Sequence, residues 1–210
     1  MKPLVSVITP TWGRHERLLN RCIPSVQSQT YRNIEHVIVS DGHDRLLAEK
    51  MLELMSGSAF YHVTQFTQLP EHSAEQHWGH LARLHGLALA RGEYIAYCDD
   101  DDALRPEHVQ VLAQCLRDDP SIGWAYSQMA SYSSDGSWTT IGNTGVPTGG
   151  QIGTPMIMHR RSILEHGTWG PASGMEDWEL VQRWTAAGIT YGRVSQVTVD
   201  VWPSAYHHHY

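Results

Sequence analysis

Short apolar runs alternate with segments of helical periodicity from the first residues of the chain. The pattern predicts a strand over residues 4–8, a helix over 18–29, a strand over 34–39 and a helix over 45–55. Pro24 falls inside the first helix and predicts a kink or a break there. Strands and helices in this alternation form a parallel sheet with helices on both faces, and such sheets bind ligands at the carboxyl ends of their strands.

The rest of the chain continues the α/β pattern with shorter and more varied elements. Further strands are predicted over residues 60–66, 94–98, 123–131, 138–141, 155–159 and 194–202, and further helices over 73–90, 106–116, 160–165 and 176–187. The turn residues at 133–137 predict a hairpin, a small antiparallel addition in the C-terminal half. A loop rich in Gly, Thr and Pro over 142–153 is long enough to be functional. We expect one domain.

Four consecutive aspartates, Asp99 to Asp102, follow the strand predicted over residues 94–98. Carboxylates this close repel one another and raise each other's pKa unless a cation neutralises them, and oxygen ligands suit Mg²⁺ or Mn²⁺. A divalent cation that carries a diphosphate is therefore the first hypothesis. The alternative is a solvated acidic turn that caps the helix near Pro106, a role that Asp102 could fill alone.

Composition narrows the class of protein further. The chain has 210 residues, 41% of them hydrophobic, which is ample for a packed core. Its formal charge of −7 argues against a broad nucleic-acid or anionic-membrane surface. No apolar run is long enough for a membrane span, and no secretion signal is visible. The three cysteines are widely spaced and lie in apolar surroundings, which suits reduced thiols. A cytoplasmic location is therefore expected.

Three groups of residues combine into a specific pattern that spans nearly the whole chain. The first group is 5–11, 22–31 and 34–42; the second is Arg83, Gly86, 90–95, the aspartates and Pro106; the third is Arg161, Gly167 and 175–180. In their order and spacing these groups resemble the family 2 glycosyltransferases, whose fold is the Rossmann-like GT-A fold. The aspartates look like the DXD motif of that family, and Glu176-Asp177 looks like its Glu-Asp motif.

The resemblance implies a role for each matching residue. The donor nucleotide would be bound by Thr9, Pro10, Thr11, Arg14, Asp41, Arg83, Asp99 and Asp100. Asp41 would accept a hydrogen bond from the base, which favours uracil and hence a UDP-sugar. Asp99 and Asp101 would serve the metal, Mn²⁺ or Mg²⁺, with His207 as a third ligand. Residues 1–105 would form the nucleotide-sugar half and residues 106–210 the acceptor half.

The implied reaction is an inverting transfer by single displacement. Asp177 would be the general base that deprotonates the acceptor hydroxyl, with Glu176 beside it to orient the acceptor. The plain alternative for this pair is a helix N-terminus with favourable dipole charge, and His207 could equally belong to a polar tail or a tag remnant. A sugar nucleotidyltransferase and a non-catalytic nucleotide-sugar or glycan-binding module remain alternative functions. The acceptor could be a saccharide, a lipid-linked glycan, a small metabolite or a modified nucleobase.

Overall fold

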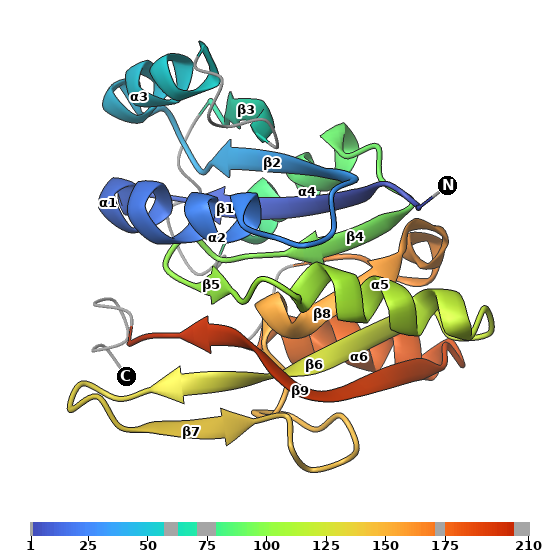
Figure 1. Ribbon diagram of the computed structural model, residues 1–210. Coiled ribbons are helices and arrows are strands. Elements are labelled where there is room, and N and C mark those ends of the chain that lie inside the picture. Colours follow the sequence, from blue (N-terminus) through green and yellow to red (C-terminus); the bar gives the residue numbers. More distant parts are fainter. Residues whose placement is uncertain (1, 57–62, 71–78, 171–174, 204–210) are drawn as a thin grey trace.

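The computed structural model of the chain describes residues 2–56, 63–70, 79–170 and 175–203 (Figure 1). Within these residues the strands form one sheet in the order β3-β2-β1-β4-β8-β6-β9-β5, with β7 paired to β6. The strands are β1 Val5–Thr11, β2 Ile34–Ser40, β3 Val63–Gln68, β4 Tyr94–Tyr97, β5 Ala103–Leu104, β6 Trp124–Tyr132, β7 Trp138–Ile141, β8 Ile157–Arg160 and β9 Tyr191–Val201. The helices are α1 His15–Arg17, α2 Ile23–Gln27, α3 Arg45–Ser56, α4 His80–Leu89, α5 His108–Asp118 and α6 Glu176–Ala186, with a π-helix at Leu18–Cys22 and 3₁₀ turns at Thr154–Met156 and Arg161–His166.

The N-terminal half is a parallel sheet centred on β1. This strand pairs in parallel with β2 and with β4, so that Val5 lies opposite both Ile34 and Tyr94. Every residue of β1 and β2 is buried, as expected for parallel strands covered on both faces. Val5 and Val7 belong to the core on the side of α2 and α5, whereas Ile8 belongs to the core on the side of α4 and α6 (Figure 1).

The C-terminal half adds the antiparallel part of the sheet. Strand β8 runs antiparallel to both β4 and β6, and β6 and β7 form the predicted hairpin. Strand β9 then lies parallel to β6 and antiparallel to β5, which directly follows the four aspartates. The predicted fold class, an α/β sheet with helices on both faces and an antiparallel addition, is confirmed.

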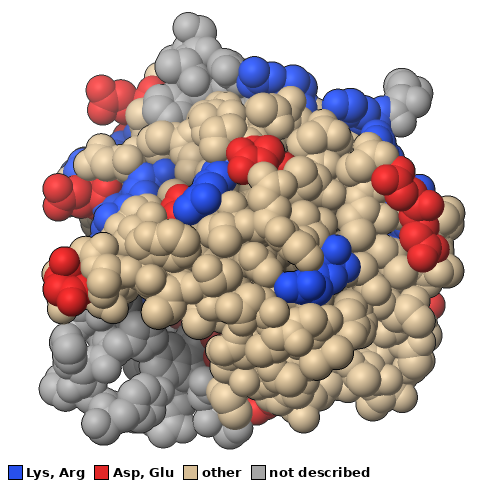
Figure 2. Space-filling model, turned by 60° about the horizontal axis from the view of Figure 1, so that its bottom comes forward, with Lys and Arg blue, Asp and Glu red and all other residues tan. Residues whose placement is uncertain are grey.

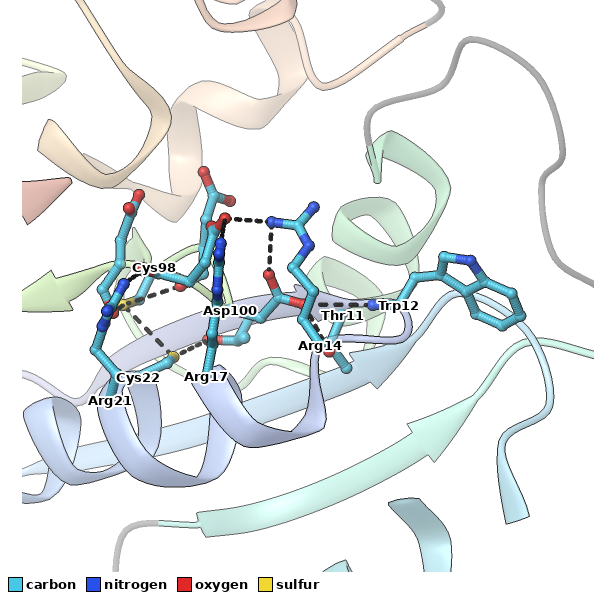
Figure 3. Close-up of polar contacts among 12 residues, drawn as sticks. Thr11, Trp12, Arg14, Arg17, Arg21, Cys22, Cys98 and Asp100 are labelled. Carbon is cyan, nitrogen blue, oxygen red and sulfur yellow. Dashed lines mark hydrogen bonds and ion pairs between the residues drawn. The ribbon is translucent and has the colours of Figure 1, made fainter. Parts of the chain in front are cut away.

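The helix predicted over residues 18–29 is broken into two pieces, the π-helix and α2, as Pro24 suggested. The N–H of Ile23 bonds to the carbonyl of Leu18, five residues earlier, which is the wider turn of a π-helix. Pro24 then lies in the first turn of α2, the position in a helix where proline is best tolerated. This arrangement places α1 and the π-helix beside Asp100, with Arg14, Arg17 and Arg21 directed toward the acidic turn (Figure 3).

Three other predicted elements differ in extent from what the structure describes. The strand predicted over residues 60–66 is seen as β3, which continues to Gln68, and residues 60–62 lie outside the described residues. The helix predicted over 73–90 is seen as α4, which begins after Gly79 and ends before Ala90, and residues 73–78 lie outside the described residues. The strand predicted to begin at Pro155 begins at Ile157 instead, because residues Thr154–Met156 form a 3₁₀ turn. Within the described part of the chain, no helix has the length and apolar character that crossing a membrane requires.

Candidate active site

The four aspartates form a tight turn between β4 and β5. The backbone N–H of Asp102 bonds to the carbonyl of Asp99, and Asp100, Asp101 and Asp102 are all buried. Burial raises the pKa of Asp100 to about 6, although Arg14 and the hydroxyl of Thr11 oppose the rise. The pKa of Asp102 is raised well above its ordinary value, by burial first and then by the charges of Asp99 and Asp101. Like charge is therefore concentrated here at an energetic cost.

Arginines from the first helical segment neutralise much of this charge. Nη1 of Arg14 bridges two aspartates, at 3.1 Å from Oδ1 of Asp100 and 2.6 Å from Oδ2 of Asp101. Nη1 of Arg17 lies 3.2 Å from the same Oδ2 of Asp101, and Arg21 donates to the backbone carbonyl of Asp101 across 2.6 Å (Figure 3). Arg17 and Arg21 were not among the residues predicted from the sequence. Arg17 and Arg21 lie three and seven residues after Arg14, and this spacing was the signal that places all three on one side of a helix.

The predicted nucleotide-binding residues meet the aspartates at the ends of β1 and β2. The hydroxyl of Thr11 donates to Oδ2 of Asp100 across 2.7 Å. The backbone N–H of Asp41 donates to the carbonyl of Thr11 across 2.9 Å, so the two strand ends are tied together. Pro10, one residue earlier, is buried and packs against Gly79, whose positive φ of 78° suits glycine.

Thr9, which was predicted to bind the nucleotide, has a buried side chain. Its side chain has no exposed surface, and its hydroxyl is hydrogen-bonded to Nε2 of His36 at 2.8 Å and approaches Sγ of Cys22 at 3.4 Å. Thr9 and Thr11 point to the same side of β1 because side chains alternate along a strand. Thr9 lies two residues deeper, beneath the π-helix, so its side chain is a core group, whereas Thr11 at the strand end reaches the acidic turn.

Arg83 joins the two acidic motifs. It comes from α4, and its side chain is only 4% exposed. Nη2 lies 2.8 Å from Oδ1 of Asp99, while Nη1 lies 3.5 Å from Oε1 of Glu176, and the guanidinium sits over the ring of Trp169. Trp169 is itself buried and also contacts the edge of Tyr97. The buried cation therefore holds the acidic turn and the start of α6 in one cluster.

Glu176 and Asp177 form the first turn of α6, as predicted. Burial raises the pKa of Asp177 to about 6, and the negative charge of Glu176 adds to this rise. A hydrogen bond from the N–H of Trp178 to Oδ1 of Asp177 opposes it. Burial likewise raises the pKa of Glu176. The glycine-rich loop reaches this turn, because Gly149 packs on the indole of Trp178. A carboxylate with a pKa near 6 beside a loop is well suited to act as a general base near neutral pH.

The carboxylates of the acidic turn fit a divalent cation for which the protein supplies some ligands and a bound substrate supplies the others. Across residues 2–56, 63–70, 79–170 and 175–203, no three His, Cys, Asp or Glu side chains are grouped closely enough to hold a metal by themselves. His207, the predicted third ligand, lies outside the described residues. Mg²⁺ is commonly held by one or two carboxylates together with substrate phosphates. Asp99 and Asp101, on a single turn, could supply such a partial set.

The face shown in Figure 2 carries scattered charges of both signs. Among its described residues no broad basic patch is visible, in keeping with the formal charge of −7.

The chain belongs to glycosyl transferase family 2, whose sequence profile matches residues 6–177. Among curated relatives, the glycosyltransferase GlyG of Streptococcus pneumoniae is 27% identical over 118 residues, covering 56% of this chain and 36% of that protein. The putative colanic acid biosynthesis glycosyl transferase WcaA of Escherichia coli is 32% identical over 110 residues, covering 52% of this chain and 37% of that protein. The matches thus span little more than a third of these relatives.

Solved structures show the same fold. The S. aureus TarS fragment 1-349 in complex with UDP-GlcNAc superposes with a TM-score of 0.74 at 17% identity, covering 98% of this chain and 60% of that one. The mannosyltransferase PcManGT from Pyrobaculum calidifontis, in complex with GDP-Man and Mn²⁺, has a TM-score of 0.71 at 15% identity and covers 99% and 59% of the two chains. The GT-A fold predicted by resemblance is confirmed.

Proposed function

We propose that this chain is a metal-dependent, inverting glycosyltransferase domain. It transfers a sugar from a nucleotide diphosphate donor, with UDP favoured, to an acceptor hydroxyl. The observation that carries the proposal is the position of Arg83, which contacts Asp99 of the acidic turn and Glu176 at the start of α6. A donor-binding motif and a candidate base, 78 residues apart between Asp99 and Asp177, are thereby brought to one place.

The donor would lie across the ends of β1, β2 and β4. Asp41 and Thr11 are joined at this edge, and Thr11 in turn contacts Asp100, so the base, the ribose and the diphosphate can be contacted in sequence. Ligands of α/β sheets bind at this edge because loops diverge there and leave a crevice. Membership of the family and the nucleotide sugars held by TarS and PcManGT support this assignment.

Asp101, with Asp99, would hold Mn²⁺ or Mg²⁺. When bound there, a divalent cation supplies positive charge for the nucleoside diphosphate that leaves the sugar. PcManGT was solved with Mn²⁺, which supports the same choice of cation here. Arg14 and Arg83 lie against the same carboxylates and would add fixed positive charge around the leaving group.

Asp177 would take the proton from the acceptor hydroxyl. The freed oxygen forms a bond to the anomeric carbon of the donor sugar while the bond from that carbon to the diphosphate oxygen breaks. The electron pair of the broken bond leaves with the diphosphate, and attack from the opposite face inverts the anomeric centre. The pKa of about 6 at Asp177 favours this role because the carboxylate is ionised at pH 7 yet remains a useful base.

The acceptor half would comprise residues 106–210, with the glycine-rich loop near Trp178 at its entrance. A saccharide, a lipid-linked glycan, a small metabolite or a modified nucleobase could each offer the hydroxyl. Since the chain matches only part of its curated relatives, the activity of the whole protein and its partners belong to the proposal.

Calorimetric titration with UDP, GDP, dTDP and ADP tests the donor site. Each titration is run with Mn²⁺ and again with EDTA. We expect one diphosphate to bind with metal dependence, and Asp101→Asn to abolish that dependence while Arg45→Gln, a change at an exposed ion pair on α3, leaves it intact. Absence of binding to all four nucleotides would refute the proposed function.

A further inference from the structure

One carboxylate oxygen of the acidic turn is contacted by two arginines. Oδ2 of Asp101 lies 2.6 Å from Nη1 of Arg14 and 3.2 Å from Nη1 of Arg17. The side chain of Asp101 is 8% exposed, so the two guanidiniums cover most of its access to water on this side. The two arginines thus supply positive charge directly at the carboxylate of Asp101.

Arg17 and Arg21 are held in different ways. The guanidinium of Arg21 is held by two contacts: it donates to the backbone carbonyl of Asp101 across 2.6 Å and lies over the ring of Trp202, 3.9 Å from its centroid. Arg17 contacts the carboxylate itself, and its side chain remains 33% exposed. An arginine on a flexible stem can leave a carboxylate and reorient toward a nearby anion, whereas one stacked on indole and bonded to backbone cannot do so cheaply.

We propose that Arg17 is a diphosphate-binding residue that Asp101 releases when its carboxylate ligates a divalent cation. This inference rests on the proposed function. A guanidinium and a divalent cation repel each other if they share one carboxylate oxygen. The contact of Arg17 with Asp101 is the longer of the two, 3.2 Å against 2.6 Å for Arg14, and Arg14 is also held by Asp100, so cation binding at Asp101 displaces Arg17 first. The displaced guanidinium then lies beside the donor diphosphate, which it can bind through two parallel N–H···O bonds.

The proposal predicts opposite effects of one substitution on two ligands. Arg17→Gln removes the cation that competes for Asp101, so Mn²⁺ alone should bind about two- to fivefold more tightly, in line with the modest strength of a partly exposed ion pair. The same variant loses a charge-assisted contact to the diphosphate, so UDP or GDP should bind about tenfold or more weakly at saturating Mn²⁺. A purely structural role for Arg17 would weaken both.

The experiment measures both affinities in four proteins. Mn²⁺ binding is followed by the electron paramagnetic resonance signal of the free ion, and nucleotide binding by calorimetry, in wild type, Arg17→Gln, Arg17→Lys and the matched control Arg45→Gln. Circular dichroism confirms folding. Arg17→Lys, which keeps the charge but not the planar fork, should fall between wild type and Arg17→Gln for nucleotide binding.

The outcomes separate this inference from the proposed function. Tighter Mn²⁺ binding together with weaker nucleotide binding in Arg17→Gln supports the inference. Mn²⁺ affinity that is unchanged or reduced, or nucleotide affinity equal to that of Arg45→Gln, overturns it while the proposed function stands. If wild type binds neither UDP nor GDP, the donor site proposed above is itself wrong for these bases and the inference fails with it.

Discussion

Nη2 of Arg83 lies 2.8 Å from Oδ1 of Asp99, so a buried cation on α4 is paired with the first aspartate of the acidic turn. The two residues are 16 positions apart, and the strand β4 separates them in the chain. The same guanidinium contacts Glu176. Removing Arg83 would therefore leave two carboxylates facing each other without a counter-charge.

We expect Arg83→Met to lower the free energy of unfolding by about 3 kcal/mol, which is the lower end of the range for breaking a buried ion pair. The lower end applies because the side chain of Asp99 is partly exposed to water. Urea denaturation at pH 7 measures this change. Arg45→Met, which breaks an exposed pair on α3, should change the free energy of unfolding by about 0.5 kcal/mol or less. Similar losses in both variants would show that Arg83 has no special role in joining the two motifs.

Asp177→Asn tests the general base directly. The amide cannot accept the proton of the acceptor hydroxyl, so kcat should fall by about two orders of magnitude or more. Donor binding, measured by the same calorimetric titration as above, should stay close to that of wild type because Asp177 lies on the acceptor side of the proposed site. A variant that loses donor binding to the same extent as kcat would point to a structural role for Asp177.

The pH dependence of the reaction should report the titration of Asp177. Its carboxyl is a base only when ionised, so kcat/KM should fall about tenfold per pH unit below a pKa of about 6 and level off above it. Glu176→Gln removes a neighbouring negative charge that raises this pKa. The midpoint of the acidic limb should therefore move to lower pH in Glu176→Gln, and an unmoved midpoint would assign the limb to another group.

His108 should make folding sensitive to acid. It is completely buried on α5, with Nδ1 2.7 Å from the hydroxyl of Thr198, and Nε2 has no hydrogen-bond partner among the described residues. Burial lowers its pKa to about 3. The unfolded chain binds a proton near pH 6.5 and the folded chain does not, so this stability is present above pH 6.5 and is lost as the pH falls toward 3.

The measurement compares wild type with His108→Asn, which keeps an amide nitrogen near the position of Nδ1. Unfolding free energies at pH 7 and pH 5 should show that the advantage of wild type shrinks by about 2 kcal/mol over this interval. Comparing two proteins cancels the contributions of Asp100 and Asp177, whose raised pKa values act in the opposite direction. A constant difference between the two proteins would mean that His108 is protonated in the fold.

Local pattern was enough to predict the elements that depend on neighbours in the chain. The turn residues before Trp138 predicted the β6–β7 hairpin, Pro24 predicted the break in the first helix, and the acidic run was correctly placed at the end of β4. Periodicity and turn chemistry act over a few residues, so these features are readable without knowing the fold. The order of strands and helices, together with the motif pattern, was enough to predict the fold class and the family as well.

Packing between distant segments decided the rest. Thr9 and Thr11 are two residues apart and face the same way, yet the π-helix covers one and the acidic turn contacts the other. Likewise Arg17, Arg21 and Arg83 lie far from the aspartates in the chain, and only the docking of their helices on the sheet brings them to Asp99 and Asp101. The sequence by itself determined which carboxylates gather at the strand ends. The tertiary structure alone decided which cations balance them, because ion pairs form through space between elements whose relative placement no local pattern encodes.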